Sequence, residues 1–309
     1  MPPVLSPTES SEPQSNDTTH SKNCEPPEPV ISAVLGLPGD VSPASGGTCE
    51  VLAITKILET AGICCCLVGI SALKYYGAGR VRHVSITISL VERPIYAVDF
   101  LTSEFKDWEI CVPTRFVEKA AQIFESEPHT KMYQTYPPGK PQIGSLLHIF
   151  PRFKIKGVSL IFTIIPDEDA HLQCIPSNIE RSRTGLPYPT LPVFAQSLVD
   201  VGDEVPLVDL IDGMDLSEGW GIENLDLDST TDISWMEKKN QGIKESVPGQ
   251  EISSVCELNV RCASKREIWI DFVRTKEKRI GAELPKEMFA TRFRTHDDVD
   301  PRSRERNFV

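Results

Sequence analysis

The sequence has no long apolar run, no Cys-x-x-Cys pair and no excess of positive charge. Its two most apolar segments, 63–70 and 158–165, have the length of strands, whereas a membrane-spanning helix needs about 20 apolar residues. The N-terminus begins Met-Pro-Pro and shows no apolar stretch of signal-peptide length. These absences predict an intracellular protein, cytoplasmic or nuclear, that neither spans a membrane nor is secreted by the usual route.

Acidic residues outnumber basic residues by 44 to 32, which gives a formal net charge of -12. The pI is about 5.1. A protein that binds nucleic acid in bulk normally carries a basic surface. The charge balance therefore argues against a nucleic-acid partner, although it is compatible with a local basic patch. No motif identifies a protein partner.

The 9 cysteines are scattered, apart from the consecutive Cys64, Cys65 and Cys66 inside an apolar run. Adjacent cysteines on a buried strand behave as small hydrophobic residues, and cysteines of cytosolic or nuclear proteins stay reduced. A zinc site is the alternative interpretation, but the short fixed ligand spacings of zinc motifs are missing. The sequence therefore predicts reduced thiols.

Composition divides the chain into four segments. Residues 1–44 are rich in Pro, Ser, Thr, Asn, Asp and Glu, and contain too little apolar surface to offset the entropy cost of ordering. We therefore predict a disordered tail here, followed by an α/β domain over residues 45–180. A helical C-terminal region over 181–295, with an acidic loop, and a charged tail over 296–309 complete the predicted organisation.

In the first half, apolar residues switch between helical and strand periodicity. Thr48 is placed to cap the first helix and Gly62 to end it, and Lys156-Gly157 predicts a tight hairpin turn. The expected helices are 48–61, 71–76 and 115–126, and the expected strands are 63–68, 107–112, 132–136, 146–155 and 158–165. This order predicts an α/β (α+β) fold, in which a mixed sheet is flanked by helices.

The second half is mainly helical in pattern. A Pro-rich stretch over 187–192 predicts a hinge, and Ser264 with Glu267 forms a capping box at a helix start. The basic residues between 274 and 279 are expected to pair with the acidic residues of the loop 226–232 or with solvent, rather than with nucleic acid. The expected helices are 190–201, 207–214, 234–246 and 264–284, and the acidic loop is 216–231.

Asp107 and Glu109 are the residues best suited to chemistry. They lie two apart on an expected strand, so their carboxylates share one face and can hold a divalent metal such as Mg²⁺. Upstream, Gly69 lies in a strand-turn-helix segment where backbone N–H groups can approach a phosphate. Ser71 and Lys74 follow it, and both could contact a nucleoside triphosphate.

With these residues the chain resembles the nucleotidyltransferase superfamily, whose motif is an apolar residue, Gly, then Gly or Ser, followed by Asp-x-Asp or Asp-x-Glu. It also looks like a large family of uncharacterised fungal proteins over most of residues 48–309. The resemblance implies a nucleotidyltransferase-like fold and no established substrate. The stretches that carry the resemblance to the fungal family are 68–76, 107–114, 151–157 and 186–227.

Two departures from the superfamily motif bear on function. Ile70 separates Gly69 from Ser71, and the strand 158–165 lacks the third carboxylate that would complete the metal site. We therefore expect a degenerate or non-catalytic member, a pseudoenzyme, in which Asp107 makes a local cap or salt link and Glu109 faces solvent. The alternative is an active Mg²⁺-dependent nucleotidyltransferase that moves a nucleoside monophosphate onto an unknown acceptor, with Asp107 and Glu109 as its catalytic metal ligands.

Other polar residues near this motif have simpler interpretations. Arg80 and Arg82 could hold phosphates, but a solvated basic turn explains them as well. His171 lies near Asp167 and Asp169 in sequence and has the residue types of a metal site. A single histidine beside surface acids usually binds no metal, so we expect none there.

The segment Val84–Lys106 separates the basic turn from the carboxylate strand. In the resembling family, His83 would run almost directly into Asp107. The segment opens with Val-Ser and ends with Lys, which the codons at intron boundaries can encode. We therefore hypothesise a translated intron, and the alternative is a genuine surface insertion, because long loops are tolerated.

Sequencing the transcript tests the intron hypothesis. We expect the abundant message to lack the codons for residues 84–106, because their removal brings Gly69 and Asp107 close to the spacing of the superfamily. An abundant message that retains these codons would contradict the hypothesis and favour a genuine insertion.

Overall fold

The structure is a computed structural model. It describes residues 47–78, 107–139, 141–158, 160–246, 257–276 and 278–279. The predicted N-terminal tail, the segment 84–106 and the charged C-terminal tail lie outside the described residues, as do Arg80 and Arg82. Residues 38–309 belong to one structural unit, and the domain boundary expected near residue 180 stays a prediction.

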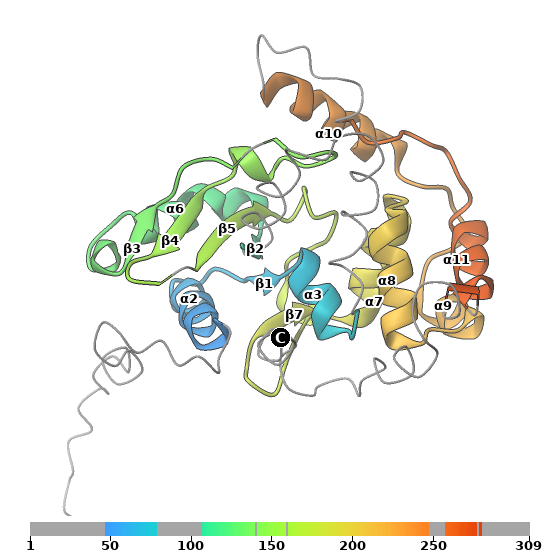
Figure 1. The fold of residues 1–309 in the computed structure, drawn as a ribbon, viewed down its shortest axis with the longest axis horizontal. Helices are drawn as coiled ribbons and strands as arrows, with labels where there is room; N and C mark the ends of the chain where they lie inside the picture. Colours follow the sequence, from blue (N-terminus) through green and yellow to red (C-terminus); the bar gives the residue numbers. More distant parts are fainter. Residues whose placement is uncertain are drawn as a thin grey trace, which may run out of the picture. The chain divides into compact units, whose positions relative to one another are not determined.

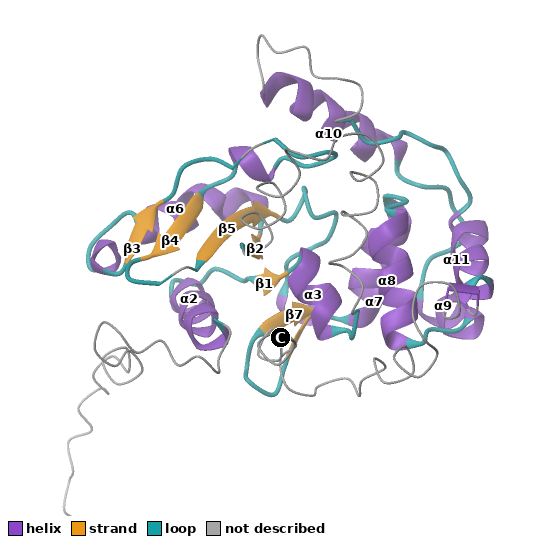
Figure 2. Cartoon of the chain, in the orientation of Figure 1, coloured by secondary structure: helices purple, strands orange, loops and turns teal. Residues whose placement is uncertain are grey.

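A five-stranded mixed sheet organises the first half of the described chain (Figures 1 and 2). Its strand order is β1-β2-β5-β4-β3, and β2 runs parallel to β5 while the other neighbouring pairs are antiparallel. Parallel strands need a long crossover, which here consists of α6 and the β3–β4 pair. The strands are β1 (Cys66–Leu67), β2 (Trp108–Val112), β3 (Tyr133–Thr135), β4 (Arg152–Ile155) and β5 (Ile161–Pro166).

The β4–β5 hairpin confirms the turn predicted at Lys156-Gly157. Gly157 has a φ of 83°, a left-handed conformation that favours glycine. The strand expected over 146–155 was too long, because Leu147–Ile149 form a short 3-10 helix and β4 begins only at Arg152. Pro151 explains this late start, since it has no N–H to continue a strand ladder.

The main hydrophobic core lies between the sheet and the helices α2, α3 and α6 (Figure 1). Strand alternation directs Trp108, Ile110 and Val112 of β2 into this core. The helices contribute their apolar stripes, as the sequence periodicity predicted. Their bounds are α2 (Thr48–Thr60), α3 (Gly69–Tyr75) and α6 (Val117–Phe124), the last preceded by a 3-10 turn, Thr114–Phe116.

The ends of α2 only partly follow the prediction. Gly62, with a φ of 75°, ends the helix as expected. Thr48 is the first helical residue rather than the cap; Gly47 occupies the cap position with a φ of 94° and offers no side-chain hydrogen bond. The first turn packs closely enough to bury Thr48, so packing outweighs capping chemistry at this helix start.

The proline-rich stretch expected as a hinge is a buried strand instead. β7 (Pro187–Pro189) pairs antiparallel with β6 (Ile179–Arg181). The ladder tolerates both prolines, because backbone hydrogen bonds flank them: the Thr190 N–H donates to the Asn178 carbonyl, and the Ser182 N–H donates to the Leu186 carbonyl. The hinge interpretation was therefore wrong.

Tyrosine packing joins this small sheet to α3. The Tyr188 ring stacks on the Tyr75 ring, with centroids 4.1 Å apart and planes inclined by 2°. The hydroxyl of Tyr76 donates a 2.6 Å hydrogen bond to the Pro189 carbonyl. Buried polar groups need such partners, so this bond allows Tyr76 to be fully buried.

The remaining described chain is helical, as predicted. Leu207, Leu210 and Ile211 of α8 belong to the same core as the sheet, and α8 contacts α3 and α7. The acidic stretch expected as a loop contains a further helix, α9, which Ser217 caps by accepting from the Trp220 N–H. The helices are α7 (Leu191–Asp200), α8 (Glu204–Met214), α9 (Glu218–Asn224), α10 (Ile233–Ser246) and α11 (Lys265–Arg274).

The capping box at α11 is confirmed in part, because Ser264 Oγ accepts from the Glu267 N–H at 3.3 Å. The helix expected to reach residue 284 is shorter, because α11 ends at Arg274 with Thr275 as its C-cap. The basic residues that follow pair internally, as favoured, but their partners are on α8 and around the start of α9 rather than in the loop 226–232. The pairs are Arg274–Glu218, Lys276–Asp215 and Arg279–Asp212.

The α/β (α+β) class predicted from the sequence is confirmed, with a mixed sheet, flanking helices and a helical region after the sheet. Among the described residues, no helix combines the length and the apolar character needed to cross a membrane.

Two glycines of α9 provide a matched test of helix packing. A Cβ at Gly221 would lie 2.1 Å from Nε1 of the fully buried Trp269, whereas one at Gly219 would meet nothing closer than 3.9 Å. We expect Gly221→Ala to lower the free energy of unfolding by about 1–3 kcal/mol, because it overpacks the α9–α11 contact.

Gly219→Ala is the control for that prediction. It should be neutral or stabilising by up to about 1 kcal/mol, because alanine favours the helix over glycine. Urea unfolding of both variants provides the measurement, and equal effects at the two positions would contradict the packing at Trp269.

Candidate functional site

The predicted carboxylates lie on the face of β2 that turns away from the main core. Trp108 and Ile110 point into the core, so alternation places Asp107, Glu109 and Cys111 on the opposite face. β2 lies between β1 and β5, so residues of both neighbouring strands border this face. The backbone therefore places Asp107 and Glu109 on one side of the sheet.

Asp107 forms an ion pair with Arg152 of β4. Arg152 Nε donates to Asp107 Oδ2 at 2.7 Å, and its Nη2 lies 2.5 Å from the same oxygen. Both side chains are largely buried, with 12% of Arg152 and 16% of Asp107 exposed. The guanidinium is also held by the Pro137 carbonyl at 3.2 Å and lies over the Tyr136 ring. Arg152 is thus a fixed part of this face.

Glu109 packs against the glycine turn. The Val68 N–H donates to the Glu109 carbonyl at 3.1 Å, which continues the β1–β2 pairing into the turn. Gly69 has a φ of 59°, and a Cβ there would lie 1.9 Å from Glu109 Oε2. Only glycine allows this carboxylate to approach so closely. The structure therefore brings Gly69 and Glu109 together.

The position expected for a third carboxylate holds a threonine. Thr163 of β5 is the register partner of Glu109 on one side and of Arg152 on the other. Its side chain is 2% exposed. The three strands thus present a row of Glu109, Thr163 and Arg152, which is one negative, one neutral and one positive side chain.

The two remaining nucleotide-binding candidates lie on α3. Ser71 is 1% exposed and packs inside the protein, so its hydroxyl is not presented to solvent. Lys74 is half-buried in the last turn of the helix. Their assignment to nucleotide binding, like that of Asp107 and Glu109 to metal, stays a prediction.

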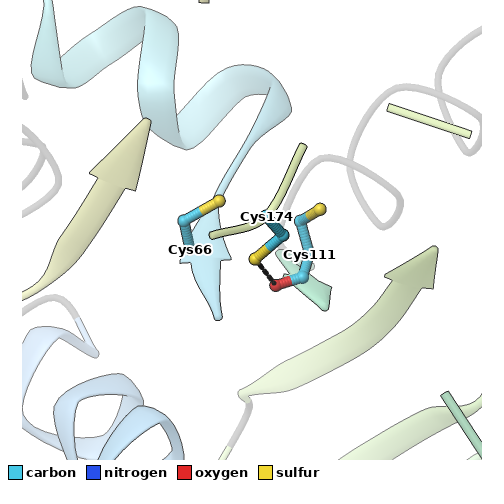
Figure 3. Close-up of side chains that lie close together, drawn as sticks. All are labelled: Cys66, Cys111 and Cys174. Carbon is cyan, nitrogen blue, oxygen red and sulfur yellow. Dashed lines mark hydrogen bonds between the residues drawn. The ribbon is translucent and has the colours of Figure 1, made fainter. Parts of the chain in front are cut away.

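A cluster of thiols lies on the same face, and the sequence analysis did not identify it. Cys66 of β1, Cys111 of β2 and Cys174, which follows β5, are fully buried, and their sulfur atoms all lie within 4.8 Å of one another (Figure 3). Cys66 and Cys111 are register partners. The alternation of Cys64, Cys65 and Cys66 was the available signal, because it predicts that the outer two share a face.

The pKa of Cys66 differs in direction of shift from those of Cys111 and the nearby Cys64. Hydrogen bonds from the Cys111 and Cys174 thiols lower the pKa of Cys66 to about 6. Burial raises the pKa of Cys111 well above its ordinary value. Burial likewise raises the pKa of the nearby Cys64 to about 12. The pKa of Cys66 is therefore shifted in the opposite direction from the pKa values of Cys111 and Cys64.

His171 pairs with carboxylates other than Asp167 and Asp169, its neighbours in sequence. Its Nε2 lies 3.0 Å from Asp232 Oδ2 and its Nδ1 lies 3.7 Å from Asp200 Oδ2. These carboxylates come from the helical region, so His171 links the segment after β5 to it. The Trp235 N–H and the His171 ring bond Asp232 and lower the pKa of that carboxyl.

Comparisons with known proteins give little further information. No protein-family model and no curated protein matches the chain. Among solved structures it is similar to the Megavirus polyadenylate synthase, with 13% sequence identity and a TM-score of 0.22. The match covers 82% of this chain and 49% of the other, so this chain spans about half the length of that structure. A TM-score this low carries no argument about function.

Substitution of two turn glycines tests the contact between Gly69 and Glu109. Gly69 and Gly62 both have positive φ, but a Cβ at Gly62 would meet nothing within 4 Å. Alanine should therefore cost about 1–2 kcal/mol of backbone strain at either position. At Gly69 we expect an additional loss in urea unfolding, because the Glu109 carboxylate must move.

The Glu109→Ala background separates the cost of backbone strain from the cost of displacing the Glu109 carboxylate. In it, Gly69→Ala and Gly62→Ala should cost the same, because the displaced carboxylate is gone. An excess loss at Gly69 that persists without the Glu109 carboxylate would show that the contact is not the cause.

Proposed function

We propose that this chain is a nucleotidyltransferase-like protein that has lost metal-dependent catalysis and acts as a non-catalytic binding module. The observation that carries the proposal is the Arg152–Asp107 ion pair. The pair gives Oδ2 of Asp107, an oxygen that a catalytic metal would need, a cationic partner from within the protein. The resemblance in motif supports the type of fold, and the ion pair supports the proposed loss of catalysis.

Arg152 opposes a bound cation in two ways. Its positive charge repels a divalent metal at Asp107 Oδ2, and it occupies the space beside that oxygen at 2.7 Å. Mg²⁺ also gives up its water reluctantly and needs near-ideal octahedral ligands. A cation would have to displace a largely buried guanidinium, and leaving that charge unpaired is costly.

The surroundings of the pair support the same conclusion. Thr163 offers a neutral hydroxyl where a third carboxylate would complete a two-metal site. The Ser71 hydroxyl is buried, which leaves it unsuited to a phosphate. With Asp107 in the Arg152 pair, Glu109 is the other carboxylate that the motif supplies on this face, so the site has fewer carboxylates than the three of the superfamily site.

An active Mg²⁺-dependent nucleotidyltransferase is the second candidate. One observation favours it: Asp107 and Glu109 share a face of β2, and Glu109 packs against Gly69. In this alternative, Asp107 exchanges Arg152 for Mg²⁺ when a nucleoside triphosphate binds, and a nucleoside monophosphate passes to an unknown acceptor.

Calorimetric titration of the full chain distinguishes the two candidates. Each of the four common ribonucleoside triphosphates is titrated with Mg²⁺, with Mn²⁺ and with EDTA. We expect no heat that depends on the metal, and no release of pyrophosphate over long incubation. The expectation follows from the occupied Asp107 oxygen and the missing third carboxylate.

Two variants make the titration decisive. Metal-dependent binding in the wild type that Glu109→Gln abolishes would refute the proposal and favour the enzyme. Arg152→Ala should begin to bind Mn²⁺ weakly, because it exposes the carboxylates. The matched control, Arg181→Ala, removes an arginine from the exposed Glu59 pair and should leave metal binding absent.

A further inference from the structure

The buried thiol cluster has the composition and geometry of a metal site. Cys66, Cys111 and Cys174 have between 0% and 1% of their surface exposed, and they come from three separate parts of the chain (Figure 3). Their sulfur atoms lie within 4.8 Å of one another. Sulfur ligands around a tetrahedral zinc ion, at about 2.3 Å from it, lie roughly 3.8 Å apart. Small side-chain rotations would therefore bring all three onto one ion.

Cys64 is available as a fourth ligand. It precedes β1 and, two residues from Cys66, lies on the same side of the extended chain. It packs against the cluster, and its thiol interacts with that of Cys174. Four cysteines from three segments would complete the tetrahedral coordination that structural zinc sites use.

The segment carrying Cys174 is fixed from outside the cluster. The Cys174 N–H donates to Asp167 Oδ2 at 3.2 Å, and the Cys174 thiol donates to the Cys111 carbonyl at 3.5 Å. The other Asp167 oxygen accepts from the N–H and hydroxyl of Thr114, at 2.9 and 2.8 Å. Asp167 therefore positions Cys174 while it ties the chain to the end of β2.

The environment of the cluster favours a soft cation over a hard one. Val68, Ile165 and Leu172 are among the apolar residues that pack around it. Thiolates select zinc and copper(I), whereas magnesium and calcium require oxygen ligands. In an apolar enclosure, a divalent ion also offsets two of the thiolate charges that would otherwise be costly to bury, and the thiol protons pass to solvent.

We propose that Cys66, Cys111 and Cys174, together with Cys64, bind one structural Zn²⁺ ion. Zinc displaces the thiol protons and joins β1, β2 and the segment after β5. This site is separate from the proposed function, although it lies on the same face of β2 as Glu109. It would act by holding the β1–β2 pairing in place.

Zinc content of the full chain tests the proposal. The protein is purified without a metal-affinity step. Bound metal is measured by elemental mass spectrometry, and by the difference in mass between the native and the denatured protein. We expect about one zinc per chain. Reconstitution with Co²⁺ should give the visible bands and sulfur-to-metal charge transfer of tetrahedral thiolate coordination.

Variants then assign the ligands. Cys66→Ala, Cys111→Ala and Cys174→Ala should lose the zinc. The matched controls, Cys49→Ala and Cys262→Ala, remove exposed cysteines and should retain it. Asp167→Asn should weaken zinc binding about 10- to 100-fold while the Co²⁺ spectrum keeps its thiolate character, because Asp167 positions a ligand without touching the metal.

Wild-type measurements keep the proposal falsifiable if the ligand variants do not fold. Removal of zinc by a chelator should lower the melting temperature of the wild type, and added Zn²⁺ should restore it. No bound zinc after reconstitution would overturn the proposal. So would a disulfide among these cysteines, seen as the loss of two hydrogens per bond in the intact mass.

Discussion

The short antiparallel pairing of β1 with β2 is the constraint on which both candidate sites depend. It sets Cys66 opposite Cys111 and joins the Val68 N–H to the Glu109 carbonyl. The same register that brings two thiols together therefore also brings the Gly69 turn onto the Glu109 carboxylate. A slip by one residue would turn each of these side chains to the other face.

The outward face of β2 is filled by partners from the chain itself. Arg152 from β4 neutralises Asp107, the Gly69 backbone lies against Glu109, and thiols surround Cys111. On a substrate-binding face, such polar side chains would be available to contact the substrate. In this chain the polar groups instead contact neighbouring strands, so Asp107 and Glu109 both have structural contacts.

The fold was largely predictable because its signals are local. Apolar periodicity identified α2, β2 and the β4–β5 turn, and the capping box identified the start of α11. The failures came from contacts between distant segments. Pro187–Pro189 form a strand only because β6 is there to pair with, and His171 meets Asp232 only through the packing of α10.

The candidate site was predictable in its motif and not in its partners. Asp107, Glu109 and Gly69 follow from residue spacing. Arg152 and Thr163 join them through strand order, which a single sequence does not reveal. The cysteine cluster is the clearest case, because Cys111 and Cys174 are far from Cys66 in sequence.

The most direct test of the account is a double-mutant cycle on Asp107→Asn and Arg152→Met in urea unfolding, with Glu59→Gln and Arg181→Met as the exposed-pair control. We predict a coupling energy of about 1–3 kcal/mol for the buried pair and about 0.2–1 kcal/mol for the exposed one, both unchanged by millimolar Mg²⁺. A coupling near zero at Asp107, or a wild type that Mg²⁺ stabilises through Asp107, would contradict the account.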